Sequence, residues 1–193
     1  MGCDIHCYKE KLVNGKWVSA DEWVEEDDGD GGTYMEVPYR KRFSERNYGL
    51  FGLLCDNVRT SHPLSFAERG MPEDASIEVE AEVERWDCDG HSHSYLSLQE
   101  LKDLLERLDS STVNVSGMMP SDRLEQFQAS MATESPDYDL MYPYCKWTTL
   151  TDWQEFSVTV PASQIMGGSL QRLIKTFEGV DGDDQRLVFF FDN

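Results

Sequence analysis

Residues 3–18 read CDIHCYKEKLVNGKWV, and this stretch decides which kind of fold we expect. Asn14-Gly15 stands between two runs of residues that favour β-strands. This is the strongest short-range signal for a β-hairpin, because a type I′ turn needs positive φ at both central residues. Successive side chains of a strand alternate between its two faces. The first strand should therefore carry Asp4, His6 and Tyr8 on one face and Cys3, Ile5 and Cys7 on the other.

The other end of the chain indicates a further strand. Residues 187–191 are apolar throughout, and so short an apolar run is typical of a strand buried on both faces. Residues 156–160 alternate between apolar and polar side chains, which also predicts a strand.

Segments between these strands have the patterns of helices. The clearest begins at Ser97, which can cap a helix while Glu100 completes a capping box and Leu96 packs on Leu101 as a hydrophobic staple. The apolar side of this helix is a leucine stripe: Leu98, Leu101, Leu104, Leu105 and Leu108. Further helices are expected at residues 44–55 and 121–131, and from an N-cap at Ser169 to Gly179.

Residues 76–86 fit two patterns, because their apolar side chains alternate strictly with glutamates and also have helical spacing. A helix is favoured, since Glu and Ala are poor strand formers and Ser76 is a good cap. Together these elements predict an α/β or α+β fold with a single mixed sheet, an N-terminal β-hairpin, and helices packed on that sheet. No clear linker divides the chain, so residues 1–193 are expected to form a single acidic globular domain.

The charge of the chain excludes several classes of function. Its 193 residues include 37 Asp and Glu against 17 Lys and Arg, a formal net charge of −20. This charge repels a phosphate backbone and an anionic membrane surface, which argues against groove-type nucleic-acid binding and against a membrane partner. No apolar run reaches the ~18–20 residues of a membrane span, and no signal peptide is visible. Five cysteines without a C-x-x-C pair indicate a reducing cytosol.

The negative charge is uneven along the chain, with a dense acidic loop at residues 21–30 and smaller clusters at 78–84 and 181–184. Seven of the ten residues from Asp21 to Asp30 are acidic, and the segment is rich in glycine, so we expect a solvated loop. A calcium loop that starts at Asp28 is rejected, because its twelfth position is Tyr39 instead of the bidentate Glu that such a loop needs.

Two short motifs suggest a metal site. Asp4-x-His6 and His91-x-His93 each place two side chains two residues apart, so each pair would share one face of a strand. Asp and His ligands suit Zn, Mn or Fe as divalent ions. The predicted metal ligands are Asp4, His6, His91 and His93, and the predicted catalytic residues are His6, His91 and His93. The alternative is that His91 and His93 are ordinary polar residues ahead of a helix.

A set of basic and polar residues suggests an anion site. Arginine has a planar fork that grips a phosphate or a carboxylate in two places, and the start of a helix also favours anions. The predicted ligand-binding residues are Arg46, Asn47, Tyr48, Arg59 and Arg69. The alternative is that these arginines form ion pairs with some of the 37 acidic residues.

Five motifs stand out in the sequence: MGCDIH (residues 1–6), RNYGLF (46–51), RGMP (69–72), DGHSHSYLS (89–97) and FFDN (190–193). Together they resemble a widespread family of small proteins from tailed bacteriophages. The resemblance runs discontinuously over residues 1–97 and returns at the end, and residues 109–165 do not share it. It implies a phage origin and the cytoplasm of an infected bacterial host, and it implies no particular reaction.

Three functions fit these observations. The first is a protein that binds or hydrolyses a small phosphate-bearing ligand, such as a nucleotide or cyclic nucleotide, as a metal-dependent hydrolase that counters host defence. The alternative is an acidic, non-enzymatic inhibitor that mimics nucleic acid and docks on a basic host protein. The third is a component of the virion, which the composition permits.

Overall fold

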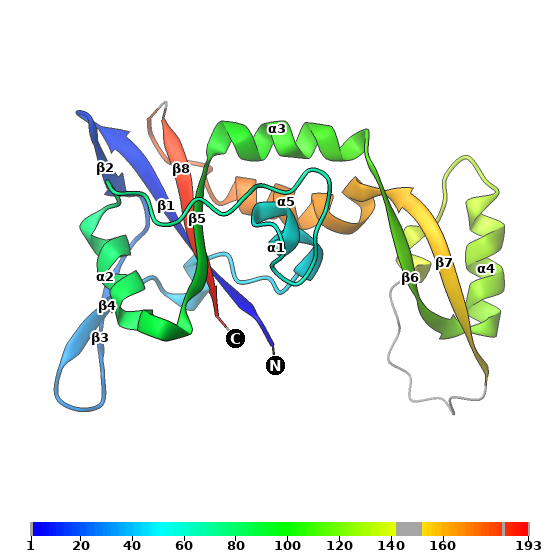
Figure 1. The fold of residues 1–193 in the computed structure, drawn as a ribbon, viewed down its shortest axis with the longest axis horizontal. Coiled ribbons are helices and arrows are strands. Elements are labelled where there is room, and N and C mark those ends of the chain that lie inside the picture. Colours follow the sequence, from blue (N-terminus) through cyan, green and yellow to red (C-terminus); the bar gives the residue numbers. More distant parts are fainter. Residues whose placement is uncertain (1, 142–151, 183, 193) are drawn as a thin grey trace. The chain divides into compact units, whose positions relative to one another are not determined.

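The structure is a computed structural model that describes residues 2–141, 152–182 and 184–192 (Figure 1). The described residues form five α-helices and eight β-strands, so the prediction of a mixed fold of helices and strands is confirmed. By its internal contacts the chain divides into two compact units, Met1–Arg107 with Ile165–Asn193, and Leu108–Gln164. The single acidic domain stays a prediction, because two compact units can still fold as one cooperative domain.

The main sheet belongs to the first unit and has the strand order β2-β1-β8-β5. Every neighbouring pair in it is antiparallel. Its strands are β1 (Asp4–Val13), β2 (Lys16–Ser19), β8 (Gln185–Asp192) and β5 (His91–Ser97). The predicted N-terminal hairpin is confirmed as β1 and β2. Asn14 and Gly15 have φ values of 52° and 77°, as a type I′ turn requires.

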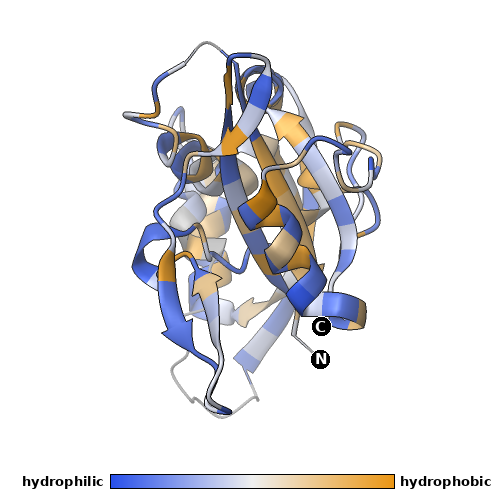
Figure 2. Cartoon of the chain, turned by 90° about the vertical axis from the view of Figure 1, so that its left-hand side faces the viewer, coloured by the Kyte–Doolittle hydropathy of each residue, from blue (hydrophilic) through white to orange (hydrophobic). Residues whose placement is uncertain are grey.

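Strand β8 lies at the centre of the hydrophobic core, as its apolar sequence predicts. Residues 186–191 are buried, and Phe190 and Phe191 have no exposed surface. Phe190 packs with Tyr8 and Val79 on one face of the sheet, whereas Phe191 contacts Phe51 on the other. Figure 2 shows the hydrophobic middle of this sheet. Burial of each large apolar side chain contributes roughly 1.5–3 kcal/mol, so β8 supplies much of the driving force for folding.

Helices pack around this sheet at the positions that the sequence predicts. These helices are α1 (Tyr48–Leu54), α2 (Ile77–Trp86), α3 (Leu98–Asp109, whose last two residues belong to the second unit) and α5 (Gly168–Lys175). The capping box of α3 is confirmed. The Glu100 backbone N–H donates to Ser97 Oγ at 3.1 Å, and the Ser97 backbone N–H donates to Glu100 Oε2 at 2.8 Å.

Two local predictions need correction. Ser169 does not cap a helix. It lies inside α5, where its Oγ accepts a hydrogen bond from Asn47 Nδ2 at 2.9 Å. The helix expected at residues 44–55 begins only at Tyr48, because Asn47 is its N-cap and accepts the Leu50 N–H at 3.1 Å.

The acidic segment that we expected to be a loop forms a second, two-stranded sheet. Its strands are β3 (Val24–Asp27) and β4 (Thr33–Glu36), which pair in antiparallel register. We call residues 24–36 the acidic hairpin. Short helical segments occupy η1 (Tyr39–Lys41), η2 (Asp87–Asp89), η3 (Tyr138–Met141) and η5 (Ser163–Gly167).

The described residues of the second unit include a long antiparallel pair of strands and the helix α4. The strands are β6 (Thr112–Pro120) and β7 (Trp153–Pro161), and α4 spans Ser121–Met131. Leu124 and Phe127 of α4 are buried, and the Phe127 ring contacts Phe156 of β7 edge-on at 6.2 Å. The sequence indicated β7 and α4 but not β6.

A buried ion pair holds one end of the main sheet together. Glu10 has no exposed surface, and its Oε2 accepts a hydrogen bond from Arg186 Nε at 2.7 Å. Its other oxygen accepts the Ser76 N–H at 2.5 Å. Arg186 also donates to Asp74 at 2.8 Å and lies over the Trp17 ring at 4.1 Å. Both charges are thus satisfied only while β1, β8 and the start of α2 are together.

Replacement of Arg186 by Met should lower the free energy of unfolding by about 3–5 kcal/mol, because Glu10 is left buried without its cation. The double variant Glu10→Leu/Arg186→Met should lose less than Arg186→Met alone, since no buried charge is then unpaired. Equilibrium unfolding in urea measures both. In the control, Arg46→Met breaks an exposed pair and should cost less than about 1 kcal/mol. Equal losses for Arg186→Met and Arg46→Met would contradict the prediction.

Candidate functional site

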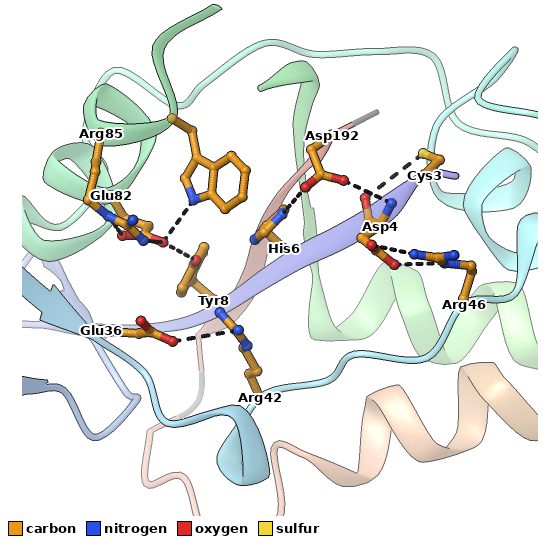
Figure 3. Close-up of polar contacts among 11 residues, drawn as sticks. Cys3, Asp4, His6, Tyr8, Glu36, Arg42, Arg46, Glu82, Arg85 and Asp192 are labelled. Carbon is orange, nitrogen blue, oxygen red and sulfur yellow. Dashed lines mark hydrogen bonds and ion pairs between the residues drawn. The ribbon is translucent and has the colours of Figure 1, made fainter. Parts of the chain in front are cut away.

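One face of β1 carries a polar side chain at four successive same-face positions, and each has a partner from a distant segment. The pairs are Asp4 with Arg46, His6 with Asp192, Tyr8 with Glu82 and Glu10 with Arg186. Figure 3 shows the first three of these pairs. The predicted placement of Asp4, His6 and Tyr8 on one face is therefore confirmed. This row of paired polar groups is the candidate functional site.

His6 lies in an aromatic stack with a carboxylate at its edge. Its ring centroid is 4.3 Å from that of Trp86 and 4.7 Å from that of Phe190, and its Nε2 is 3.3 Å from Asp192 Oδ2. Burial lowers the pKa of His6 below 6.5, although the hydrogen bond and the charge of Asp192 act in the opposite direction. His6 is therefore neutral near pH 7 and must carry its proton on Nε2 to donate to Asp192.

Asp4 and Arg46 form the exposed end of the row. Arg46 donates to both carboxylate oxygens, from Nε at 2.8 Å and from Nη2 at 2.5 Å. The two side chains are 49% and 51% exposed, so solvent competes with the pair. The guanidinium holds the pKa of Asp4 below its usual value. The backbone N–H of Asp4 also donates to Asp192 Oδ1 at 3.0 Å, which joins the two ends of the chain.

Three more of the predicted ligand-binding residues lie near this end. Arg59 donates to the Gly2 carbonyl at 2.7 Å, and its guanidinium lies 5.5 Å from the centroid of the Tyr48 ring. Asn47 caps α1 and donates to Ser169, so it has a structural role. The structure therefore brings Arg46 and Arg59 to the first residues of β1, as a shared site requires.

Arg69 has different surroundings. It donates to Glu100 at 2.6 Å and to the Tyr95 carbonyl at 3.1 Å, and it stacks over Phe66 and Tyr95. The backbone N–H of the next residue, Gly70, donates to the His93 carbonyl at 2.9 Å. Arg69 thus holds the loop before α2 along β5.

The two histidines of the His91-x-His93 motif lie on opposite faces of the main sheet, so the expectation of a shared face is wrong. The pairing of β5 with β8 shifts register between His91 and Ser94, and Ser92 has a φ of 51°. As a result His91 stacks on Phe191 at 6.2 Å and His93 stacks on Phe190 at 5.3 Å. A β-bulge adds one residue to its strand and so reverses the alternation of side chains. His93 therefore shares a face with His6, and His91 does not.

Five residues of the row were absent from the predicted site: Tyr8, Glu10, Glu82, Arg186 and Asp192. Glu82 is 3% exposed, and it accepts hydrogen bonds from Tyr8 Oη at 2.9 Å, from Trp86 Nε1 at 3.1 Å and from Arg85. The sequence places it among solvated glutamates, and only the polar Tyr8 on the inner face of β1 signals a buried partner. Asp192 was noticed solely as part of the terminal FFDN motif.

The predicted divalent metal gains no support from the described residues. Within residues 2–141, 152–182 and 184–192, no group of three or more His, Cys, Asp or Glu side chains is placed to hold a metal ion. The bulge separates His91 from His93, and Asp4 is engaged by Arg46. The metal site stays a prediction, as does the catalytic role of His6, His91 and His93.

Comparisons with family models, with curated proteins and with solved structures gave no match. Among the helices in the described part of the chain, none is long and apolar enough to cross a membrane.

The lowered pKa of His6 predicts how stability changes with pH. Below pH 6.5 the unfolded chain protonates this histidine while the folded chain does not, so the free energy of unfolding should fall as the pH falls from 6.5 through the lower, folded pKa. His6→Phe keeps an aromatic ring between Trp86 and Phe190 but cannot titrate. Its stability should therefore depend less on pH in this window, as urea unfolding at a series of pH values would measure. An unchanged pH dependence would contradict the prediction.

Proposed function

We propose that this chain is an acidic binding protein that docks on a basic partner protein, where its carboxylates mimic the charge of a nucleic acid. The observation that carries the proposal is a contrast between the positive and the negative side chains: the arginines are bonded within the protein, whereas most carboxylates of the acidic hairpin face solvent. The arginines predicted to bind a phosphate already donate to protein groups, Arg46 to Asp4, Arg59 to Gly2 and Arg69 to Glu100. Five of the six carboxylates of the acidic hairpin are exposed, all except Glu36.

The acidic hairpin displays its charges on an ordered backbone. Its exposed acids are Glu25, Glu26, Asp27, Asp28 and Asp30, and residues 24–36 contain no Lys, Arg or His. At the turn, Asp28 Oδ1 accepts the N–H groups of Asp30 and Gly32, both at 2.9 Å. These bonds hold the turn in one conformation. Less conformational freedom is then lost on binding than for a flexible acidic tail.

Helix α2 extends the negative surface. Glu78, Glu80 and Glu84 alternate with apolar residues along it, and residues of α2 and β4 line the same hollow. Close carboxylates create a negative potential that speeds association with a basic surface. A DNA-binding or RNA-binding protein offers such a surface, since it is built to bind a row of phosphates. On this proposal the origin is a tailed bacteriophage and the partner is a protein in the cytoplasm of its bacterial host.

A competition experiment tests this function. The full chain should displace double-stranded DNA from the heparin-binding protein fraction of a bacterial lysate at low salt, and about 1 M salt should abolish the effect because the screening length is then ~3 Å. The triple variant Glu25→Gln/Glu26→Gln/Asp30→Asn should displace much less DNA. It keeps Asp27 and Asp28, whose carboxylates accept hydrogen bonds within the turn.

The matched control removes the same number of charges from exposed positions elsewhere, by Glu106→Gln/Glu125→Gln/Glu178→Gln. This control should compete like the unmodified chain. The proposal fails if the unmodified chain displaces no DNA, or if both triple variants lose the same share of the effect.

A second candidate function is the binding or hydrolysis of a small phosphate-bearing ligand at the Arg46 end of the row. One observation favours it: residues from both ends of the chain and from the segment 46–59 converge there, and the Asp4–Arg46 pair is exposed enough to exchange partners. A phosphate that replaced Asp4 would retain the two-pronged contact with the arginine.

Calorimetric titration with a panel of nucleotides and cyclic nucleotides, with and without Zn or Mn ions, tests this second function. We expect binding that Arg46→Ala weakens by at least tenfold, since a two-pronged, charge-assisted contact is lost. Hydrolysis that depends on the added metal and disappears in His6→Ala would identify a metal-dependent hydrolase. No binding by the unmodified chain would exclude these ligands.

A further inference from the structure

The acidic hairpin and α2 enclose an open groove of about 650 Å³. Its lining includes Tyr34 and Met35 of β4 and Ile77, Glu78, Ala81 and Glu84 of α2. This volume is in the range of sites that hold a few side chains of a partner. All these residues belong to the first unit and to the described part of the chain.

The lining of this groove includes several exposed apolar side chains. Ile77 is 76% exposed and Met35 is 47% exposed, and Ala81 is exposed beside them. Exposed apolar side chains that stand alone need no explanation, but a group of them in a hollow marks an interaction surface. An isoleucine at the first position of an exposed helix gains nothing from solvent, so its burial by a partner would be favourable.

The rim of the groove is negatively charged. Its lining includes the carboxylates of Glu78, Glu82 and Glu84. The cation in the lining, Arg85, is held by two bonds to Glu82 and lies 4.5 Å from the centroid of the Tyr34 ring. The carboxylate of Glu82 thus neutralises the charge of Arg85. The groove therefore presents a net negative charge to a partner.

We infer that this groove is the part of the surface that recognises the partner, and that it binds a short basic segment with an apolar side chain between lysines or arginines. The inference rests on the proposed function and makes it more specific. The apolar side chain would cover Ile77 and Met35, and the basic side chains would lie against Glu78 and Glu84. An apolar centre with a charged rim is the usual anatomy of a protein interface. The centre contributes most of the affinity, and the rim contributes mainly to the rate of association.

Two synthetic peptides test the inference, one of alternating lysine and leucine and one of alternating lysine and serine. Both carry the same charge, so an acidic surface without an apolar site would bind them equally. We expect the full chain to bind the lysine–leucine peptide about tenfold more tightly in fluorescence anisotropy, because burial of one large apolar side chain is worth at least that factor. Ile77→Ser should remove this preference.

Further variants separate the apolar contribution to peptide binding from the electrostatic contribution. Val13→Ser changes another exposed apolar residue, which is 41% exposed on the β1–β2 hairpin, and it should leave the preference intact. Glu78→Gln/Glu84→Gln should weaken the binding of both peptides by a similar factor and should make that binding less dependent on salt. Because Ile77 is largely exposed, its replacement should not unfold the chain, and circular dichroism checks this.

The experiments distinguish failure of the inference about the groove from failure of the proposed function. Equal binding of both peptides overturns the inference about the groove, and so does a preference for the lysine–leucine peptide that survives Ile77→Ser. In either case the acidic hairpin can still compete with DNA. No binding of either peptide at low salt, together with no displacement of DNA, overturns the proposed function itself.

Discussion

The pairing of β1 with β8 is the interaction on which the rest of the structure depends. It joins Asp4 to Asp192 and continues in register to Lys11 and Gln185, so nearly the whole chain lies between the paired strands. Closure of such a long loop costs conformational entropy, which must be offset by the contacts it creates. The buried phenylalanines of β8 supply that compensation. The His6–Asp192 contact also exists only because these two strands are neighbours.

Donors from several segments explain how an acidic chain tolerates carboxylates in its core. Glu10 and Glu82 are almost fully buried, and each accepts hydrogen bonds from an arginine and from other donors. A buried carboxylate without such partners would be strongly destabilising. Basic residues are scarce, and many of them are used in this way or in exposed pairs. The surplus of negative charge therefore remains at the surface, which is why binding of a basic partner is the better-supported proposal.

Local signals in the sequence predict much of the fold. The Asn14-Gly15 turn, the capping box of Ser97 and Glu100, and the apolar run at residues 187–191 all act over a few residues, and all three are found as expected. The choice of a helix at residues 76–86 is also correct, because the structure has α2 there. For the candidate site, the shared face of Asp4, His6 and Tyr8 followed from the same reasoning. Partners such as Asp192 and Glu82 did not.

The sequence by itself determined the secondary structure around strong local signals, the faces of β1 and the overall negative charge, because steric preferences and side-chain periodicity act between near neighbours. Only the tertiary structure decided which polar groups meet. The bulge at Ser92 separates His91 from His93, and the acidic segment folds into a hairpin instead of a loop. Such outcomes depend on the strand or helix that lies alongside, and that neighbour comes from a part of the chain that no local pattern can identify.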